Sequence, residues 1–502
     1  MRQSGLGHFP LGQSIPPKEH AVCVSLPTVR DLVGYEEKKP ETLSKLSSGY
    51  PRFVRHRKIE ALSRFWNQKD SSKDCINYFF TNLEDWDFAK NTIPICEAEV
   101  KKEDNYLRVK IPENSASSRE IQKFIQHVGC GMSSRHAESI LESIGLVCNS
   151  EFVQPNPLAS NEIKDVIAKA HGPEINSTDV LLTNSGANSF TSAFRASLQL
   201  TRSKNKHVWI RLGWLYLDTI EIMELLTREN ETIISLNHPD QFESINNLFE
   251  KYGDKIAGVV TEFPSNPLLH SCDLEQVSQL CRIHNSLLIV DPTMASPKNA
   301  KVCRYADIVI NSLTKYANWE GDVMLGSLVF PSFSPLGLEV REYTEQLLTP
   351  PFSKDLERLA EQIQNYENFI SKTNESLSNV VEFLKSHPKI KEVYWAYQEK
   401  TRINYEKIAG TGKPGCVVSF EIDGNFELFY NSLAMLKSPS FGTEFSICCP
   451  YVYLAHYDKI TSKDGMKELS DSGLVPELCR LSVGLEDPNE IKVALDRALY
   501  FA

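Results

Sequence analysis

The chain has 502 residues, a length that allows two or three domains. Hydrophobic residues make up 41% of it and charged residues 24%, so the composition supports a sizeable core and excludes wholesale disorder. The formal net charge of -11 argues against a nucleic-acid partner and against binding to an anionic membrane.

Signals for targeting, membrane insertion and metal binding are weak along the whole sequence. The longest apolar runs, such as residues 286–290, are too short to cross a bilayer, and no signal peptide is apparent in the first 17 residues. The 12 cysteines are scattered and form no Cys-x-x-Cys pair. We therefore expect a cytoplasmic location, reduced thiols, no membrane association and no metal site.

The first part of the chain, residues 1–118, shows little periodicity, and we expect it to be an N-terminal extension that packs on the main domain. One short strand is expected at residues 20–26 and another at residues 77–80. The NSASS stretch at 114–118 is expected to form a loop before a helix that begins near Arg119.

A clear alternation of apolar runs and helical patterns begins near residue 175. The apolar runs occupy residues 179–183, 208–212, 256–262, 286–291 and 307–310, and helical patterns such as 274–284 separate several of them. This order predicts an α/β fold with a mostly parallel sheet that is covered on both faces. In such sheets ligands collect at the carboxyl ends of the strands.

A helical stripe and a second α/β region follow. Apolar residues at spacings of three and four predict one long helix over 355–386, and strands near 415–420 and 478–483 predict a smaller C-terminal α/β domain. We divide the chain into the extension (1–118), a large domain (119–375) and a small domain (376–502).

Lys315 is the residue around which the candidate site is organised. It follows Ser312 and Thr314 at the end of the strand expected at 307–310. A desolvated lysine can bind a carbonyl as a Schiff base, and neighbouring hydroxyls can hold a phosphate. Asp291 ends the previous strand, and its carboxylate could pair with a protonated pyridine nitrogen. A single lysine is usually solvated and a single aspartate usually caps a turn, so the prediction rests on their conjunction.

Other candidates also follow predicted strands. Ser185, Gly186 and Ala187 open a helix whose free amides suit a phosphate, although a Ser-Gly turn at a helix start is usually only a turn. Either Tyr216 or Trp214 could stack on a planar cofactor, with core packing as the alternative for both.

Two polar residues complete the set drawn from the residues alone. Asn266 could approach a ring hydroxyl, whereas the commoner use of such an asparagine is a proline-flanked turn. Arg480 offers a planar fork to a substrate carboxylate, and its alternative is a surface salt bridge with Glu486 or Asp487.

Taken together, these stretches resemble the Cys/Met-metabolism group of fold-type I pyridoxal phosphate (PLP) enzymes, over about residues 130–500. The group includes cystathionine γ-synthase, cystathionine lyases and O-acetylhomoserine sulfhydrylase. The N-terminal stretches GQSIPPKEHAVCVSLPT, VGYEE and GYPRFVRH are similar to the extension of fungal cystathionine γ-synthases. The matching blocks are NSGAN at 184, EFPSNPLL at 262, VDPTMASP at 290, NSLTKYANWEGDV at 311, SFGTEFS at 440 and RLSVGLED at 480.

The resemblance implies a role for each matching residue. Lys315 would bind PLP covalently and move protons, and Asp291 would pair with the pyridine nitrogen. Tyr216 would stack on the ring and act in catalysis, and Asn266 would lie near the ring hydroxyl. Ser440 would position the lysine, and Arg480 would bind the substrate α-carboxylate. The phosphate would be held by Ser185, Gly186, Ala187, Ser312 and Thr314.

The chain departs from the family pattern at three places. A Tyr-x-Arg pair, which the family donates to the phosphate across a dimer interface, is absent from residues 129–138, and Arg135 is a displaced candidate for that role. The usual Tyr-Gly-Gly-Thr block reads Tyr216-Leu-Asp-Thr219, and Asn311 stands where histidine is usual. These departures concern the reaction subtype more than the cofactor.

The implied reaction is γ-replacement on O-acetyl- or O-succinyl-homoserine, with cysteine giving cystathionine. Sulfide as the nucleophile would give homocysteine, a β- or γ-eliminating lyase is a third reading, and a PLP-fold regulatory or scaffold protein with weak turnover is a fourth. The family builds its active site between two protomers, so the resemblance also implies a homodimer or a homotetramer. The expected partners are small-molecule amino-acid substrates and further copies of the chain, with no nucleic acid and no membrane.

Overall fold

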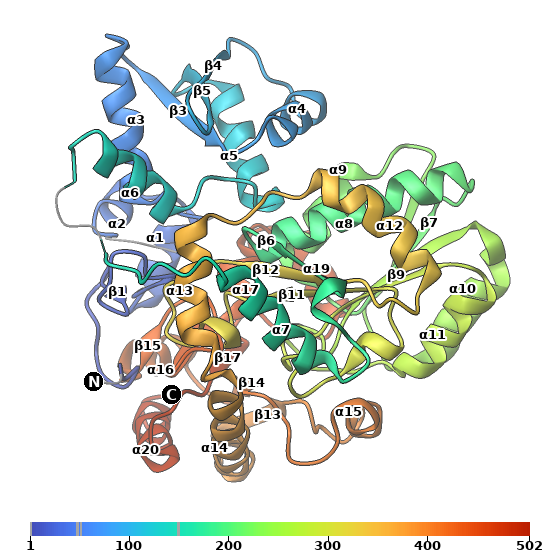
Figure 1. The fold of residues 1–502 in the computed structure, drawn as a ribbon. Helices are drawn as coiled ribbons and strands as arrows, with labels where there is room; N and C mark the ends of the chain where they lie inside the picture. The colour runs from blue at the N-terminus through green and yellow to red at the C-terminus, as the bar shows by residue number, and fades with distance from the viewer. Residues whose placement is uncertain (1–2, 47–49, 51–52, 148–150) are drawn as a thin grey trace.

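The computed structural model describes residues 3–46, 50, 53–147 and 151–502 (Figure 1). Gly49, Pro51 and Arg52 of the GYPRFVRH block lie outside the described residues. In the described part of the chain, no helix is long and apolar enough to cross a membrane.

A seven-stranded sheet forms the centre of the molecule. Its strands, in spatial order, are β6 (Val180–Thr183), β12 (Gly326–Val329), β11 (Ile308–Ser312), β10 (Leu287–Asp291), β9 (Ile256–Glu262), β7 (Val208–Leu212) and β8 (Thr232–Leu236). Only β12 runs antiparallel to its neighbours, so the predicted mostly parallel sheet is confirmed. The strands β8 and β12 were not predicted.

Both faces of this sheet are buried. Along β10, Leu288 and Val290 belong to one hydrophobic cluster, whereas Leu287 and Ile289 belong to the cluster on the other face. This alternation is the reason that the strand is apolar at every position. The helices that accompany the sheet are α7 (Ala159–His171), α8 (Gly186–Ser203), α9 (Leu217–Leu226), α10 (Phe242–Tyr252), α11 (Leu274–Ile283), α12 (Pro335–Leu347) and α13 (Ser353–Ile363).

The N-terminal part carries its own antiparallel sheet, in the order β3 (Cys75–Phe80), β5 (Leu107–Pro112), β4 (Glu99–Lys102). It is drawn at the top of Figure 1 with α3 (Arg57–Lys69), α4 (Leu83–Thr92) and α5 (Ala116–Val128), and α6 (Ser134–Ser143) follows. The helix expected near Arg119 begins earlier, at Ala116, because the Ser115 hydroxyl caps it by accepting from the Ser118 amide.

The strand expected at residues 20–26 is shorter than predicted. Only β2 (Cys23–Val24) pairs, with β1 (Ser14–Ile15). The flanking amides bond elsewhere, since Val22 donates to the Gly321 carbonyl and Leu26 to the Lys437 carbonyl. Two short helices follow, α1 (Val29–Glu36) and α2 (Pro40–Leu43).

A five-stranded sheet forms the C-terminal part, in the order β13 (Ile390–Tyr394), β14 (Val417–Ile422), β17 (Cys479–Ser482), β16 (Ile447–Pro450), β15 (Leu436–Lys437). Only β15 and β16 are parallel to each other. The helices of this part are α14 (Tyr366–Ser386), α15 (Arg402–Ala409), α16 (Phe426–Ser432), α17 (Tyr451–Ala455), α18 (Tyr457–Ile460), α19 (Lys463–Asp471) and α20 (Pro488–Leu499).

The single long helix expected over 355–386 is two helices, α13 and α14, with a break at residues 364–365. Near the end of α13 the Gln362 carbonyl accepts from the Trp319 indole at 2.9 Å, and the Gln362 side chain donates to Asp322. Both contacts are made to the loop after Lys315, so tertiary bonding at this point overrides the helical period.

Hydrophobic packing crosses the three divisions made from the sequence. Leu26 and Leu32 of the first segment share a cluster with Leu377 of α14 and Val418 of β14. Residues of β3 and β5 share another cluster with Phe190 and Phe194 of α8. The division at 118 and 375 stays a prediction, whereas Leu26, Leu32 and Tyr35 pack against residues of the C-terminal sheet such as Val418.

Candidate active site

A cavity opens at the carboxyl ends of β7, β9, β10 and β11, between the large sheet and the C-terminal sheet. This is the edge at which the predicted polar residues follow their strands. Nine of the predicted residues line it: Gly186, Ala187, Tyr216, Asn266, Asp291, Ser312, Lys315, Ser440 and Arg480. Residues that sequence reasoning had not assigned also line it, among them Tyr50, Phe53, Glu262, Thr293, Phe441, Cys449 and Tyr451.

Lys315 lies between β11 and the short 3-10 helix Tyr316–Asn318, and 9% of it is exposed. Its Nζ donates to Ser440 Oγ at 3.0 Å and to the Tyr50 hydroxyl at 3.4 Å. The rings of Tyr50 and Phe441 lie with their centroids 4.7 and 5.1 Å from Nζ. Burial lowers the pKa of Lys315 and favours the neutral, nucleophilic amine.

Ser440, which accepts the hydrogen bond from this amine, has a strained backbone conformation. Its φ is +113°, a conformation that residues with a Cβ rarely adopt, and its carbonyl accepts from Arg480 Nη2 at 3.2 Å. One residue therefore contacts both Lys315, through its hydroxyl, and Arg480, through its carbonyl.

Two carboxyl groups lie side by side at the floor of the cavity. Asp291 of β10 and Glu262 of β9 are paired in register, and burial raises the pKa of both, with Asp291 adding to the effect on Glu262. Asp291 Oδ1 accepts from the Thr293 amide at 2.8 Å, and Glu262 accepts from the Tyr216 amide. A cationic ring nitrogen would relieve this crowding of negative charge, so the donor set fits a protonated pyridine.

The start of α8 supplies a cradle for an anion. Ser185 caps the helix by accepting from the Asn188 amide at 3.1 Å. A Cβ at Gly186 would stand 2.8 Å from the Ser312 Cβ, so only glycine allows β11 to approach the helix so closely. Free amides and the Ser312 hydroxyl therefore meet at the cavity, as a bound phosphate requires.

Ser185 and Thr314 do not themselves line the cavity. The Ser185 hydroxyl donates to the Gly129 carbonyl at 2.9 Å, and the Thr314 hydroxyl bonds to the backbone of Leu325 at 3.3 Å. Their hydroxyls shape the two turns, and the predicted direct contact with phosphate stays a prediction for both.

Arg480 lies on β17 and is 6% exposed. Its Nη1 donates to Asn266 Oδ1 at 3.0 Å, and its guanidinium lies 4.9 Å from the Tyr451 ring centroid. The surface salt bridge that was the alternative for Arg480 does not form, because the Glu486 carboxylate accepts from the amides of Gly5 and Ser446. The fork thus faces the cavity, where it can meet a carboxylate.

The structure separates the two aromatic candidates. Tyr216 lines the cavity at the start of α9. Trp214 instead donates to His456 Nε2 at 3.0 Å and packs with Leu268 and Val452 in a separate cluster. Stacking by Tyr216 on a cofactor stays a prediction.

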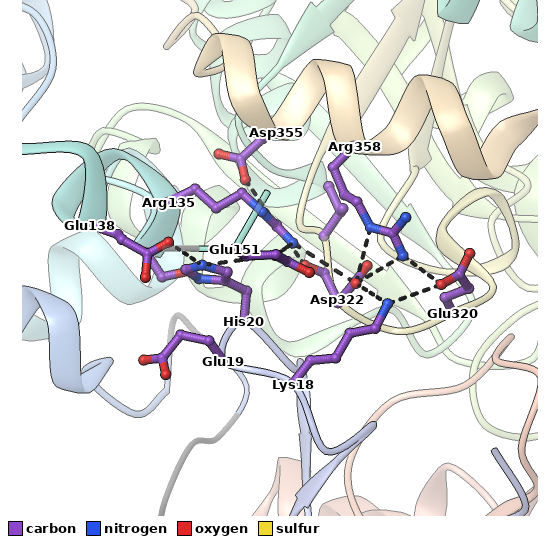
Figure 2. Close-up of polar contacts among 12 residues, drawn as sticks. Lys18, Glu19, His20, Arg135, Glu138, Glu151, Glu320, Asp322, Asp355 and Arg358 are labelled. Atoms are coloured by element: carbon purple, nitrogen blue, oxygen red, sulfur yellow. Dashed lines mark hydrogen bonds and ion pairs between the residues drawn. The ribbon is translucent and has the colours of Figure 1, made fainter. Parts of the chain in front are cut away.

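Arg135 does not line this cavity within the one chain, and its predicted role at the phosphate of a partner protomer stays a prediction. Its Nη1 donates to the Asp322 carbonyl at 2.7 Å and to Asp355 Oδ1 at 3.2 Å, and its Nη2 donates to Glu151 at 2.8 Å (Figure 2). A guanidinium that is 2% exposed and already bonded to these acceptors is committed to an internal ion-pair cluster.

Sequence reasoning missed three contacts that shape the site. Thr293 accepts from the Ser312 amide at 2.9 Å and so ties the turn after β10 to β11. The Tyr451 hydroxyl accepts from Asn266 at 3.2 Å. Tyr50 comes from far away in the sequence, and its only sequence signal is its place in the GYPRFVRH block.

Comparison with known proteins identifies the family. The model of the Cys/Met metabolism PLP-dependent enzymes matches residues 159–500. The chain belongs to this family. Its cofactor is pyridoxal phosphate, and the cavity described above carries the lysine, carboxylate and anion cradle that this cofactor needs.

Curated relatives match over nearly the whole chain. An L-2-amino-4-chloropent-4-enoate dechlorinase/desaturase of Streptantibioticus cattleyicolor is 29% identical, with 95% of both chains covered. A cystathionine gamma-synthase of Neurospora crassa is 24% identical, with 98% of both chains covered.

Solved structures show the same fold, PLP fold type I. A cystathionine gamma lyase of Micromonospora echinospora superposes with a TM-score of 0.59 at 22% identity, covering 69% of this chain and 88% of that one. A cystathionine gamma synthase of Xanthomonas oryzae, in complex with aminoacrylate and cysteine, superposes with a TM-score of 0.58 at 20% identity, covering 69% of this chain and 86% of that one.

Within the described residues, no group of His, Cys, Asp and Glu is arranged to hold a metal ion.

Proposed function

We propose that the protein catalyses replacement of a γ-substituent on an L-amino acid, with an activated homoserine ester as donor and cysteine as the incoming thiol. The observation that carries the proposal is that Lys315, Asp291 and Arg480 line one cavity. This set provides a proton carrier, a partner for a cationic ring and an anchor for an α-carboxylate.

Bound PLP supplies an electron sink for negative charge that develops beside the amino group of the substrate. Arg480 binds the α-carboxylate through its fork and fixes the direction in which Cα faces Lys315. Lys315 Nζ takes the proton from Cα, and its reach to Ser440 Oγ at 3.0 Å sets its starting position. The same amine then moves the Cβ proton, so that the substituent on Cγ can leave and a thiol can add there.

Asp291 and Glu262 would provide the negative charge that pairs with a cationic ring nitrogen. Without a cofactor, the raised pKa values favour the protonated forms of these two carboxyl groups. A cation on the ring would instead favour their ionised forms. The hydroxyl of Ser312 and the first amides of α8 would hold the phosphate.

A second candidate is elimination without replacement, in which the γ-substituent leaves and no thiol adds. Two observations favour it. The relative that is a dechlorinase/desaturase is 29% identical over 95% of the chain, and apolar side chains of Phe53, Phe190 and Leu454 line the cavity. An apolar lining suits an unsaturated side chain.

The test is an assay of the purified, PLP-loaded protein with O-acetyl- and O-succinyl-homoserine, each with cysteine, with sulfide or alone. Cystathionine supports the leading proposal, homocysteine indicates a sulfhydrylase, and 2-oxobutyrate from the ester alone indicates elimination. Cystathionine as the only substrate tests for a lyase through pyruvate or 2-oxobutyrate. An L-2-amino-4-chloropent-4-enoate reaction that releases chloride would move the assignment to the second candidate. No product in any mixture would contradict both candidates and favour a scaffold protein.

We also propose that the protein is a homodimer or a homotetramer and acts in methionine and cysteine metabolism without nucleic acid or membrane. Light scattering after gel filtration measures the oligomer directly. A monomer that turns over substrate would contradict the oligomer proposal and leave the reaction untouched.

A further inference from the structure

Two aromatic rings lie against the guanidinium of Arg480. Its central carbon is 5.2 Å from the centroid of the Phe441 ring and 4.9 Å from that of the Tyr451 ring. Cys449 of β16 pairs in register with Arg480 of β17, and Tyr451 follows two residues later. The Tyr451 amide donates to the Leu478 carbonyl at 3.0 Å, which fixes the chain at this point. The end of β16 therefore places the Tyr451 ring against the residue that we expect to bind a substrate carboxylate.

The hydrogen bonds of Arg480 determine how the side-chain amide of Asn266 is oriented. Arg480 Nη1 donates to Asn266 Oδ1 at 3.0 Å, and a guanidinium has no acceptor, so the amide oxygen of Asn266 must face it. The amide nitrogen then faces Tyr451 and donates to its hydroxyl oxygen at 3.2 Å. The three side chains thus form one hydrogen-bonded series with a single possible direction of donation.

This series leaves the hydroxyl proton of Tyr451 available. The hydroxyl oxygen accepts from Asn266, and within the described residues the hydroxyl donates no hydrogen bond. Only 3% of Tyr451 is exposed, and the residue lines the cavity together with Arg480. A buried phenol whose proton has no protein acceptor can donate to a ligand in that cavity.

The surroundings of Tyr451 keep its phenol protonated and its ring in place. Burial raises the pKa of the phenol, and this effect exceeds the lowering by Arg480. The ring packs against His456, with centroids 5.8 Å apart, and Trp214 Nε1 donates to His456 Nε2 at 3.0 Å. Trp214 and Tyr451 belong to one hydrophobic cluster, so Trp214 supports Tyr451 and is not itself in the lining of the cavity.

We propose that Tyr451 is a second substrate-binding residue, whose hydroxyl donates a hydrogen bond to the α-carboxylate that Arg480 holds. The guanidinium supplies the charge, and Tyr451 supplies a neutral donor beside it, so that the carboxylate is oriented as well as attracted. The inference rests on the proposed function in one respect, which is that Arg480 anchors the α-carboxylate. It applies equally to γ-replacement and to elimination, because the α-carboxylate reacts in neither.

The test is calorimetric titration of the PLP-loaded, full-length protein with L-norleucine and with n-pentylamine. Norleucine has no γ-leaving group, and pentylamine is the same molecule without the α-carboxylate. Tyr451→Phe keeps the ring against the guanidinium and removes only the hydroxyl. It should raise the Kd for norleucine by about tenfold, because a hydrogen bond to a charged group is lost, and leave the Kd for pentylamine unchanged.

The matched control is Tyr453→Phe, two residues further along α17. The Tyr453 ring stacks on Phe426 with centroids 6.0 Å apart, and Tyr453 is not in the lining of the cavity. This variant should match wild type with both ligands. Arg480→Lys is the second comparison, and it should weaken the binding of norleucine without changing that of pentylamine.

Three outcomes would overturn the inference, and they differ in what else they affect. An unchanged Kd for norleucine in Tyr451→Phe, with weaker binding in Arg480→Lys, would overturn the role of Tyr451 alone. Equal weakening of both ligands in Tyr451→Phe would show that the hydroxyl acts on packing or on the cofactor. Wild-type protein that binds norleucine no more tightly than pentylamine would also remove Arg480 as the anchor. Failure of γ-replacement by itself would leave the titration unchanged, since norleucine has no group to replace.

Discussion

The Lys315 cavity and the cluster around Asp322 are both buried groups of charged residues, yet their charges are balanced in opposite ways. In the cavity, burial lowers the pKa of Lys315 and raises the pKa values of Asp291 and Glu262, so each group is pushed toward its neutral form. In the cluster, burial alone would raise the pKa of Asp322, but Arg135, Arg358 and Lys18 hold it at about 2.

The comparison distinguishes charged residues that can bind a ligand from charged residues that stabilise the fold. Ionised groups that are already paired with protein neighbours, as in Figure 2, have little left to offer a ligand. Groups that the fold keeps short of counter-charge, as at Asp291, gain when a ligand of opposite charge arrives. Within this chain the Arg135 guanidinium is bonded to Asp355 and Glu151, which a sequence cannot show, and its predicted contact with a partner's phosphate stays a prediction.

The largest expected effect is the loss of enzymatic activity when Lys315, in the cavity, is replaced. Lys315→Ala should reduce turnover by at least about a thousandfold, because it removes the nucleophile and the proton carrier together. It should not lower the free energy of unfolding of the cofactor-free protein, since the buried amine is held short of counter-charge. Steady-state kinetics and urea unfolding measure the two effects. A variant that keeps wild-type turnover would remove Lys315 from the mechanism.

The second effect concerns stability in the cluster. Asp322→Asn should lower the free energy of unfolding by about 3–5 kcal/mol, because three cations lose the buried carboxylate that they share. Urea unfolding at neutral pH measures it. Glu345→Gln, which breaks the exposed i,i+4 pair with Arg341, is the control and should cost less than about 0.5 kcal/mol. Equal costs for the two variants would contradict the distinction between the regions.

The third effect is on substrate binding. Arg480→Lys should raise KM for the amino acid by about ten- to a hundredfold, because an ammonium cannot reproduce the two parallel bonds of the fork. Absorbance of bound PLP should change little, since Arg480 contacts Asn266 and Ser440 and not the lysine. A fall in kcat at unchanged KM would mean that Arg480 acts on the reacting atoms instead.

The smallest effect is an opposite pH dependence of the two regions. Asp322 has a lowered pKa, so its stabilisation is complete above the unfolded value of about 4 and is lost as the pH falls toward 2. Asp291 has a raised pKa, so the cofactor-free protein should lose stability as the pH rises above that unfolded value. Unfolding of Asp291→Asn across pH should lack the second slope, and PLP should remove it from wild type. A wild-type protein whose stability rises steadily from pH 4 to 7 without PLP would contradict this account.

Much of the fold and the centre of the site were predictable from the sequence for a physical reason. Parallel strands that are buried on both faces leave continuous apolar runs, and their carboxyl ends meet at one edge, so Asp291 and Lys315 could be placed together. The family blocks added Arg480 and Ser440.

The remainder depends on contacts between distant segments. Tyr50 reaches Lys315 across 265 positions, and Lys18 reaches Asp322 across 304. No local pattern records such pairs. The break between α13 and α14 has the same origin. The Trp319 indole donates to the Gln362 carbonyl, and the helix ends there although the apolar spacing in the sequence continues without a gap.

The central claim is that Lys315 is the residue that binds PLP in a cavity prepared for it. Borohydride reduction of the PLP-loaded protein, followed by proteolysis and mass spectrometry, tests it most directly. The account predicts a yellow protein that bleaches on reduction, with one pyridoxyl group on the peptide that carries Lys315. A colourless protein that takes up no PLP, or a label on another lysine, would contradict it.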